Sequence, residues 1–206
     1  TTILTGAGHH VIINTIGKIH DYIADIQTIR HSPPSANQNH PFTLQIGDPN
    51  TIAARTGITT VADFRRKDIA LGGEAAPLAP GFHHAAFASE TLNRAIINIG
   101  GMANITWLPA ASTGNAVSGF DTGPGNCLMD AWISRHQSKP YDDKGSWSKT
   151  GIVIPELLSR LMTEPYLQKQ PPKSTGKELF NLAWLDQHLS QTSFNPAAED
   201  VQATLC

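Results

Sequence analysis

A single carboxylate in a glycine-rich stretch has the clearest chemical potential in this sequence. Residues 119–126 read GFDTGPGN and place Asp121 in a tight glycine turn between a short strand, about residues 116–120, and a predicted helix from 127. The helical spacing of residues 128, 131 and 132 predicts that Trp132 lies in the core. Glycines let a ligand approach the main chain, and the first N–H groups of a helix favour anions. Asp121 is therefore either a base beside a phosphate site or a helix cap, and the octapeptide alone leaves both open.

A glycine hairpin is predicted just before this stretch. Residues 95–99 form one apolar run and residues 102–108 a second, and Gly100 and Gly101 separate them. This pattern predicts two strands joined by a tight turn, with Asn98 and Asn104 near the tip. Such a tip is either a backbone cradle for phosphate or an ordinary turn.

A half-buried strand is predicted at residues 42–46 and a short helix at 49–55, ended by Gly57. A charged segment follows another predicted strand, at residues 58–62. Residues 63–68 read DFRRKD and include Asp63, Arg65 and Arg66. Ligands of open α/β sheets bind outside the carboxyl ends of strands. We therefore treat this segment as a candidate binding site.

Composition narrows the function classes. The 206 residues carry a net charge of −2, which gives no electrostatic case for a nucleic-acid or anionic-membrane partner. No apolar run has the length of a membrane span. The nine histidines and two cysteines show no metal-ligand spacing, so no metal-binding residue is predicted. Two cysteines make no disulfide framework, and we expect a cytoplasmic protein.

Both ends of the sequence look cut. It begins at Thr1 without an initiator Met, and it stops soon after a helix is predicted to begin near residue 196. We expect a partial chain of a longer protein.

Six motifs stand in an order that resembles the anhydro-N-acetylmuramic acid kinase family. They are residues 27–31 (QTIRH), 44–48 (LQIGD), 61–68 (VADFRRKD), 98–101 (NIGG), 120–126 (FDTGPGN) and 172–177 (PKSTGK). The resemblance runs from about Gln27 to the C-terminus. It implies an α/β, actin-like (ribonuclease H-like), two-lobed nucleotide-binding fold, incomplete here, with mixed sheets flanked by helices. Residues 1–92 would be part of the N-terminal, substrate-side lobe, and residues 93–206 the first part of the C-terminal lobe.

The resemblance implies a kinase of cell-wall recycling. Such an enzyme opens the 1,6-anhydro ring of its sugar with water and phosphorylates O6 with ATP and Mg²⁺, giving N-acetylmuramate 6-phosphate. Its partners would be the small amino sugar and ATP, with a homodimer as one option for its assembly.

The resemblance also assigns roles to residues. Asp121 would be the general base, Arg66 would bind the sugar's carboxylate, and Gln27 and Thr28 would add polar contacts. Asp63 would either contact the sugar or hold the loop through an ion pair, and the same two readings apply to Arg65. The ATP phosphates would be met by Gly100, Gly101, Asn104 and Gly123.

Departures from the family pattern leave an alternative open. Residues 1–26 match it poorly, and two loops expected to hold ATP are absent from the printed sequence. We therefore expect little or no kinase activity from this polypeptide alone, and the alternative is a sugar-binding fragment that cannot hold ATP. A glycosidase is disfavoured, because the sequence shows no second acid/base carboxylate beside Asp121 and glycosidases usually use a pair.

Overall fold

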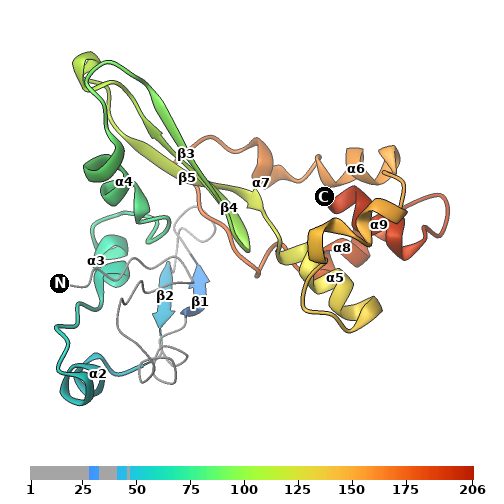
Figure 1. The fold of residues 1–206 in the computed structure, drawn as a ribbon, viewed down its shortest axis with the longest axis horizontal. Coiled ribbons are helices and arrows are strands. Elements are labelled where there is room, and N and C mark those ends of the chain that lie inside the picture. Colours follow the sequence, from blue (N-terminus) through green and yellow to red (C-terminus); the bar gives the residue numbers. More distant parts are fainter. Residues whose placement is uncertain (1–27, 33–40, 46) are drawn as a thin grey trace. The chain divides into compact units, whose positions relative to one another are not determined.

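The structure is a computed structural model that describes residues 28–32, 41–45 and 47–206 (Figure 1). The chain divides into two compact units. Unit 1 holds the described residues up to Ile96, with Ile105–Phe120 and Pro171–Ser174. Unit 2 holds Ile97–Asn104, Asp121–Gln170 and Thr175–Cys206. The architecture is mixed α/β, and the expected division into lobes at residue 92 stays a prediction.

The described part of unit 1 contains a two-stranded antiparallel sheet and three α-helices. Strand β1 (Thr28–Ser32) pairs with β2 (Phe42–Gln45), with Thr28 opposite Gln45 and Ser32 opposite Phe42. Strand β2 confirms the strand predicted there, and its burial alternates, with Thr43 buried and Phe42 and Leu44 exposed. The helices are α2 (Pro49–Thr56), α3 (Phe64–Ala70) and α4 (Ala79–Phe87).

Helix α2 has clear start and stop signals. The Asp48 side chain accepts hydrogen bonds from the Asn50 and Thr51 N–H groups, both at 3.1 Å, and so caps the first turn. Gly57 ends the helix with a φ of 68°, a left-handed conformation that favours glycine. The short helix predicted here is confirmed.

The strand predicted at residues 58–62 is wrong. This segment is irregular, and Asp63, with a φ of 61°, leads directly into α3. Its β-branched residues favour a strand only where a partner supplies hydrogen bonds. Asp63 and Arg66 therefore lie at the start of a helix and not at the carboxyl end of a strand.

The glycine hairpin is confirmed. Strand β3 (Arg94–Ile99) and strand β4 (Met102–Leu108) flank Gly100 and Gly101, and β5 (Ser118–Pro124) lies on the other side of β4. A short 3₁₀ helix, η1 (Ala111–Thr113), connects β4 to β5.

Strand β5 extends further than predicted. We expected Asp121 in a turn, but the strand continues to Pro124, and the Thr122 hydroxyl donates to the Ala103 carbonyl on β4 at 3.1 Å. Asp121 and Gly123 therefore lie on one face of a strand, because side chains alternate along it.

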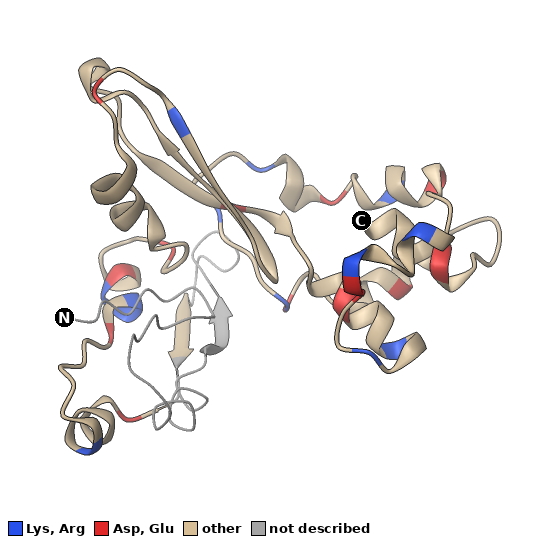
Figure 2. Cartoon of the chain, in the orientation of Figure 1, with Lys and Arg blue, Asp and Glu red and all other residues tan. Residues whose placement is uncertain are grey.

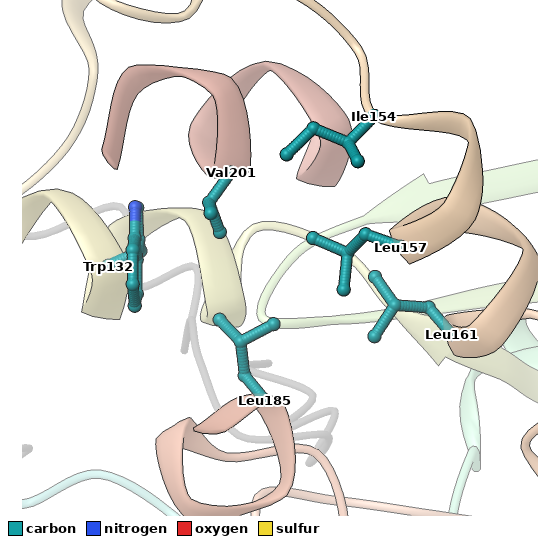
Figure 3. Close-up of a cluster of buried hydrophobic side chains, with 6 residues drawn as sticks. All are labelled: Trp132, Ile154, Leu157, Leu161, Leu185 and Val201. Carbon is teal, nitrogen blue, oxygen red and sulfur yellow. The ribbon is translucent and has the colours of Figure 1, made fainter. Parts of the chain in front are cut away.

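Helices pack around two apolar clusters in unit 2. The first cluster includes Trp132, which confirms its predicted place in the core, and Figure 3 shows its six labelled members pointing toward one another. The second comprises Cys127, Leu128, Tyr166 and Phe180. The helices are α5 (Cys127–Gln137), α6 (Pro155–Leu161), α7 (Pro165–Gln168), α8 (Leu182–Leu189) and α9 (Ala198–Leu205), with the 3₁₀ turns η2 (Asp143–Gly145) and η3 (Ser148–Thr150).

The surface of the helices in unit 2 carries both signs of charge. Figure 2 shows Lys and Arg interspersed with Asp and Glu along them, and Arg135 pairs with Asp186 at 2.6 Å. Among the described residues, none of the helices has the length and apolar character that crossing a membrane requires.

Candidate active site

The Asp121 carboxylate is buried and held in place. The side chain is 5 % exposed, and its Oδ2 accepts the Thr175 backbone N–H at 3.1 Å. The Tyr166 hydroxyl donates to the main-chain carbonyl of Asp121 at 2.7 Å. The amide and the hydroxyl together fix the position of the Asp121 side chain and of its main chain.

Aromatic packing supports this arrangement. Tyr166 lies on α7, and its ring meets Phe180 edge-on, with centroids 5.9 Å apart. Phe180 packs in turn against Trp184, whose indole N–H donates to Glu164 at 2.8 Å. Glu164 also accepts the Tyr166 N–H and so caps α7. Tyr166, which donates to the Asp121 carbonyl, is therefore itself held by Phe180 and by Glu164.

The segment 175–178 (TGKE) of unit 2 is a part of the site that reasoning from sequence alone missed. It resembles a nucleotide loop only superficially, since the glycine spacing of a Walker motif is absent. In the structure Lys173, Ser174 and Thr175 are all buried, and Thr175 reaches Asp121. Within unit 1, the Lys173 ammonium lies 5.7 Å from the centre of the Phe120 ring. The sign of this in the sequence was that the polar residues 172–177 form one of the six motifs of the family resemblance.

Glu178 supplies a second carboxyl group in this segment. Burial raises its pKa, and the charge of Asp121 raises it further, while backbone N–H groups of Glu178 and Gly176 act the other way. The residue nevertheless keeps an exposed surface. The sequence showed no second carboxylate near Asp121 because the two residues are far apart in the chain.

The hairpin tip is tied to the start of α5. Three consecutive N–H groups donate to its carbonyls: Gly125 to Gly101 at 2.9 Å, Asn126 to Gly100 at 2.8 Å and Cys127 to Gly101 at 3.3 Å. These amides are therefore occupied by the hairpin tip and are not available to an anion, although the N-terminus of a helix often binds one. They serve to position the tip instead.

The glycines around the tip differ in how much space they have. A Cβ on Gly100 or Gly101 would make ordinary van der Waals contacts, none closer than 3.7 Å, so the tip is bare backbone that a small side chain would not crowd. A Cβ on Gly125 would overlap the Gly100 carbonyl oxygen, so only glycine fits there. Gly123 is buried with a φ of 155°, and Asn104 is 6 % exposed.

The predicted sugar-binding residues lie in unit 1. Asp63 and Arg66 form an exposed ion pair at 3.4 Å, with 72 % and 68 % of their side chains accessible. Arg65 is instead buried and donates to the Ala75 carbonyl at 2.8 Å. Thr28 lies in β1, and Gln27 lies outside the described residues.

The buried thiol of unit 2 is not suited to nucleophilic chemistry. Burial raises the pKa of Cys127 to about 11, although the positive charge of Lys177 lowers it in part. Across the described parts of the chain, no three His, Cys, Asp or Glu side chains are grouped so that they could hold a metal ion.

Known proteins align with most of the chain. The family model described as "Anhydro-N-acetylmuramic acid kinase" matches residues 14–206. A protein of that name from Coxiella burnetii (strain Dugway 5J108-111) is 58 % identical over 179 residues, which are 87 % of this chain and 46 % of the relative. One from Saccharophagus degradans is also 58 % identical over 179 residues, and one from Shewanella putrefaciens is 56 % identical over 180, each match covering 87 % of this chain and 47 % of the relative.

These matches identify the family of the chain. All three relatives are named as kinases, and the buried carboxylate and glycine hairpin of unit 2 lie inside the matched residues. The chain belongs to the anhydro-N-acetylmuramic acid kinase family. It spans about half the length of the curated relatives it matches.

Proposed function

We propose that the protein containing this chain is an ATP-dependent kinase of an anhydro amino sugar. It would open the 1,6-anhydro ring of anhydro-N-acetylmuramic acid with water and phosphorylate O6, in cell-wall recycling in the cytoplasm. The fold would be the actin-like, two-lobed one. The observation that carries the proposal is the buried Asp121 carboxylate on β5, the strand that pairs with β4 of the glycine hairpin.

Asp121 would act as general base on the attacking water. Its carboxylate would take a proton as the water oxygen bonds to the anomeric carbon and the bond from that carbon to O6 breaks. The electron pair left on O6 would then attack the γ-phosphate. A fixed base favours this sequence, since phosphoryl transfer depends mainly on positioning and charge compensation.

The hairpin tip would meet the phosphates. The Gly100 and Gly101 carbonyls accept bonds from the start of α5. The tip's amides are then the groups that suit an anion, and the absence of side chains lets phosphate approach them. ATP would supply the phosphoryl group, with Mg²⁺ as its counter-ion. The described residues offer no cluster of metal ligands, so we assign Mg²⁺ no protein ligand among them.

Arg66 would bind the lactyl carboxylate of the sugar, which a guanidinium matches in shape and charge. Its exposed pairing with Asp63 at 3.4 Å is weak enough to be exchanged for a ligand. Thr28 and Gln27 would add polar contacts to the same sugar. Asp63 would either contact the sugar or position Arg66.

The test replaces Asp121 by Asn in a protein of the relatives' full length that carries this sequence. We expect sugar binding to be kept and kcat to fall by at least about 100-fold, because the amide cannot accept the proton. Sugar affinity is measured by calorimetry and product formation by mass spectrometry. A variant that turns over at the original rate would remove Asp121 as the base.

The sugar-binding fragment is tested separately. Calorimetry on residues 1–206 with the sugar alone, and then with Mg-ATP alone, separates the two functions. Heat from the sugar without heat from the nucleotide favours the fragment. We expect this polypeptide alone to turn over little substrate, and robust turnover would overturn that expectation.

A further inference from the structure

The buried position of Asp121 creates a problem for the proposed reaction, on which this inference rests. After taking a proton from water, Asp121 must lose it before the next turnover. Its side chain is 5 % exposed, so direct exchange with bulk solvent is restricted. A second group that reaches both Asp121 and solvent would remove the restriction.

Segment 175–178 of unit 2 brings the Glu178 carboxyl group toward Asp121. The Thr175 N–H donates to Asp121, and the next N–H along the chain, that of Gly176, acts on the Glu178 carboxylate. The Phe180 N–H donates to the Gly176 carbonyl at 3.1 Å and closes the turn that folds Glu178 back. A Cβ on Gly176 would overlap the Glu178 carboxylate, which shows how closely the side chain lies over the backbone. Two adjacent amides therefore hold two carboxyl groups.

We propose that Glu178 carries the proton from Asp121 to solvent between turnovers. The Asp121 carboxyl group gives its O–H proton to the Glu178 carboxylate, directly or through one water, and returns to the charged form. Glu178 then releases the proton to the buffer. No bond other than O–H changes, and no electron donor or acceptor is needed.

The electrostatics support this direction of transfer. Burial raises the pKa of Glu178, so its carboxylate accepts a proton more readily than an ordinary glutamate does. Asp121 is the charged side chain that acts on it, whereas Lys177, the neighbour in sequence, acts on Cys127 and Asp130. The exposed part of Glu178 gives the proton its way out.

The first experiment measures the coupling without measuring activity. Carbon-13 NMR of the Glu178 carboxyl in the full-length protein should show a titration above the ordinary range. The pKa should fall in Asp121→Asn, because the neighbouring negative charge is gone. A Glu178 titration that is ordinary, or that Asp121→Asn leaves unchanged, overturns the proposal whatever the enzyme does.

The second experiment measures turnover. Glu178→Gln in the full-length protein should lower kcat by about tenfold or more, leave the KM for the sugar within about twofold, and regain rate as the concentration of a small carboxylic acid buffer rises. Glu90→Gln makes the same change at an exposed position of unit 1 and should leave kcat unchanged. A loss that buffer does not relieve would mean a structural role and would overturn the relay.

The two proposals fail differently. If Asp121→Asn lowers the rate and Glu178→Gln does not, the relay is wrong and the base stands. If neither change lowers the rate, the proposed function itself is wrong.

Discussion

The surroundings of Asp121 and of Arg66 differ in kind. Asp121 is 5 % exposed and is held by a backbone amide, while a tyrosine hydroxyl fixes its own carbonyl. The Arg66 side chain is 68 % exposed and pairs with Asp63 at 3.4 Å. A base must be in place before the reaction begins, whereas a side chain that binds a charged ligand gains by exchanging a weak partner for it. These surroundings agree with the two roles proposed above, a base in unit 2 and a ligand-binding side chain at the start of α3.

The largest expected effect is on the core that supports unit 2. Leu185 is fully buried among six clustered residues, and Leu185→Ala should cost about 2–5 kcal/mol of unfolding free energy. Phe82 on α4 of unit 1 is 48 % exposed, and Phe82→Ala should cost less. Urea unfolding followed by circular dichroism compares the two variants. Equal losses would remove the contrast between the regions.

A smaller effect is expected at the hairpin tip. Gly125→Ala forces a Cβ onto the Gly100 carbonyl and should cost about 1–3 kcal/mol, with a loss of nucleotide binding. Gly81→Ala is the matched control, because a Cβ there meets nothing within 4 Å. Since Gly81 lies inside α4, that change should stabilise the protein slightly. Thermal unfolding and nucleotide titration report the outcome, and a neutral Gly125→Ala would contradict the close packing of tip and helix.

Two adjacent arginines should separate stability from recognition within unit 1. Arg65→Ala leaves the buried Ala75 carbonyl without its donor and should cost about 1–3 kcal/mol. Arg66→Ala should leave the unfolding midpoint unchanged, and should weaken sugar binding about tenfold or more through the lost charge-assisted bond. Denaturation and calorimetry on both variants decide this. Sugar affinity that survives Arg66→Ala would exclude its proposed contact.

The smallest effect is chemical and leaves stability unchanged. Because burial raises the pKa of Cys127 to about 11, about one molecule in a thousand carries its thiolate at pH 8. Cys206 is exposed and should react with iodoacetamide first, while Cys127 should react faster as the pH rises toward its pKa or after denaturation. Peptide mass spectrometry locates the label. Rapid labelling of native Cys127 at pH 8 would show a looser core than the structure has.

Local signals in the sequence were enough to predict the hairpin, α2 and the core position of Trp132. Each depends on neighbours in the chain: two glycines between apolar runs, a cap before a proline, an apolar face at helical spacing. The strand at 58–62 failed, because β-branched residues favour a strand only where another strand pairs with them. Asp121 was expected in a turn because glycines flank it, and nothing local in the sequence indicates that β5 pairs with β4.

The partners of the candidate site were harder to predict. The Thr175 amide that reaches Asp121 lies 54 residues further along the chain, and the Tyr166 hydroxyl lies 45 residues further. No periodicity or motif spacing relates residues that lie so far apart in the chain. The family resemblance supplied Asp121, Arg66 and the tip glycines as predictions, and their roles stay predictions. The resemblance assigned no role to Glu178, because the influence of Asp121 on this residue depends on how segment 175–178 folds.

The bonds between the hairpin tip and α5 also have a mechanical consequence. Three amides at the start of the helix hold the Gly100 and Gly101 carbonyls, and further along the same helix Trp132 is packed in the core. The tip cannot move independently of α5, since these hydrogen bonds link it to a helix whose Trp132 is packed in the core. A phosphate that immobilises the tip should therefore slow hydrogen exchange at Gly125 and Asn126, residues that the ligand need not touch.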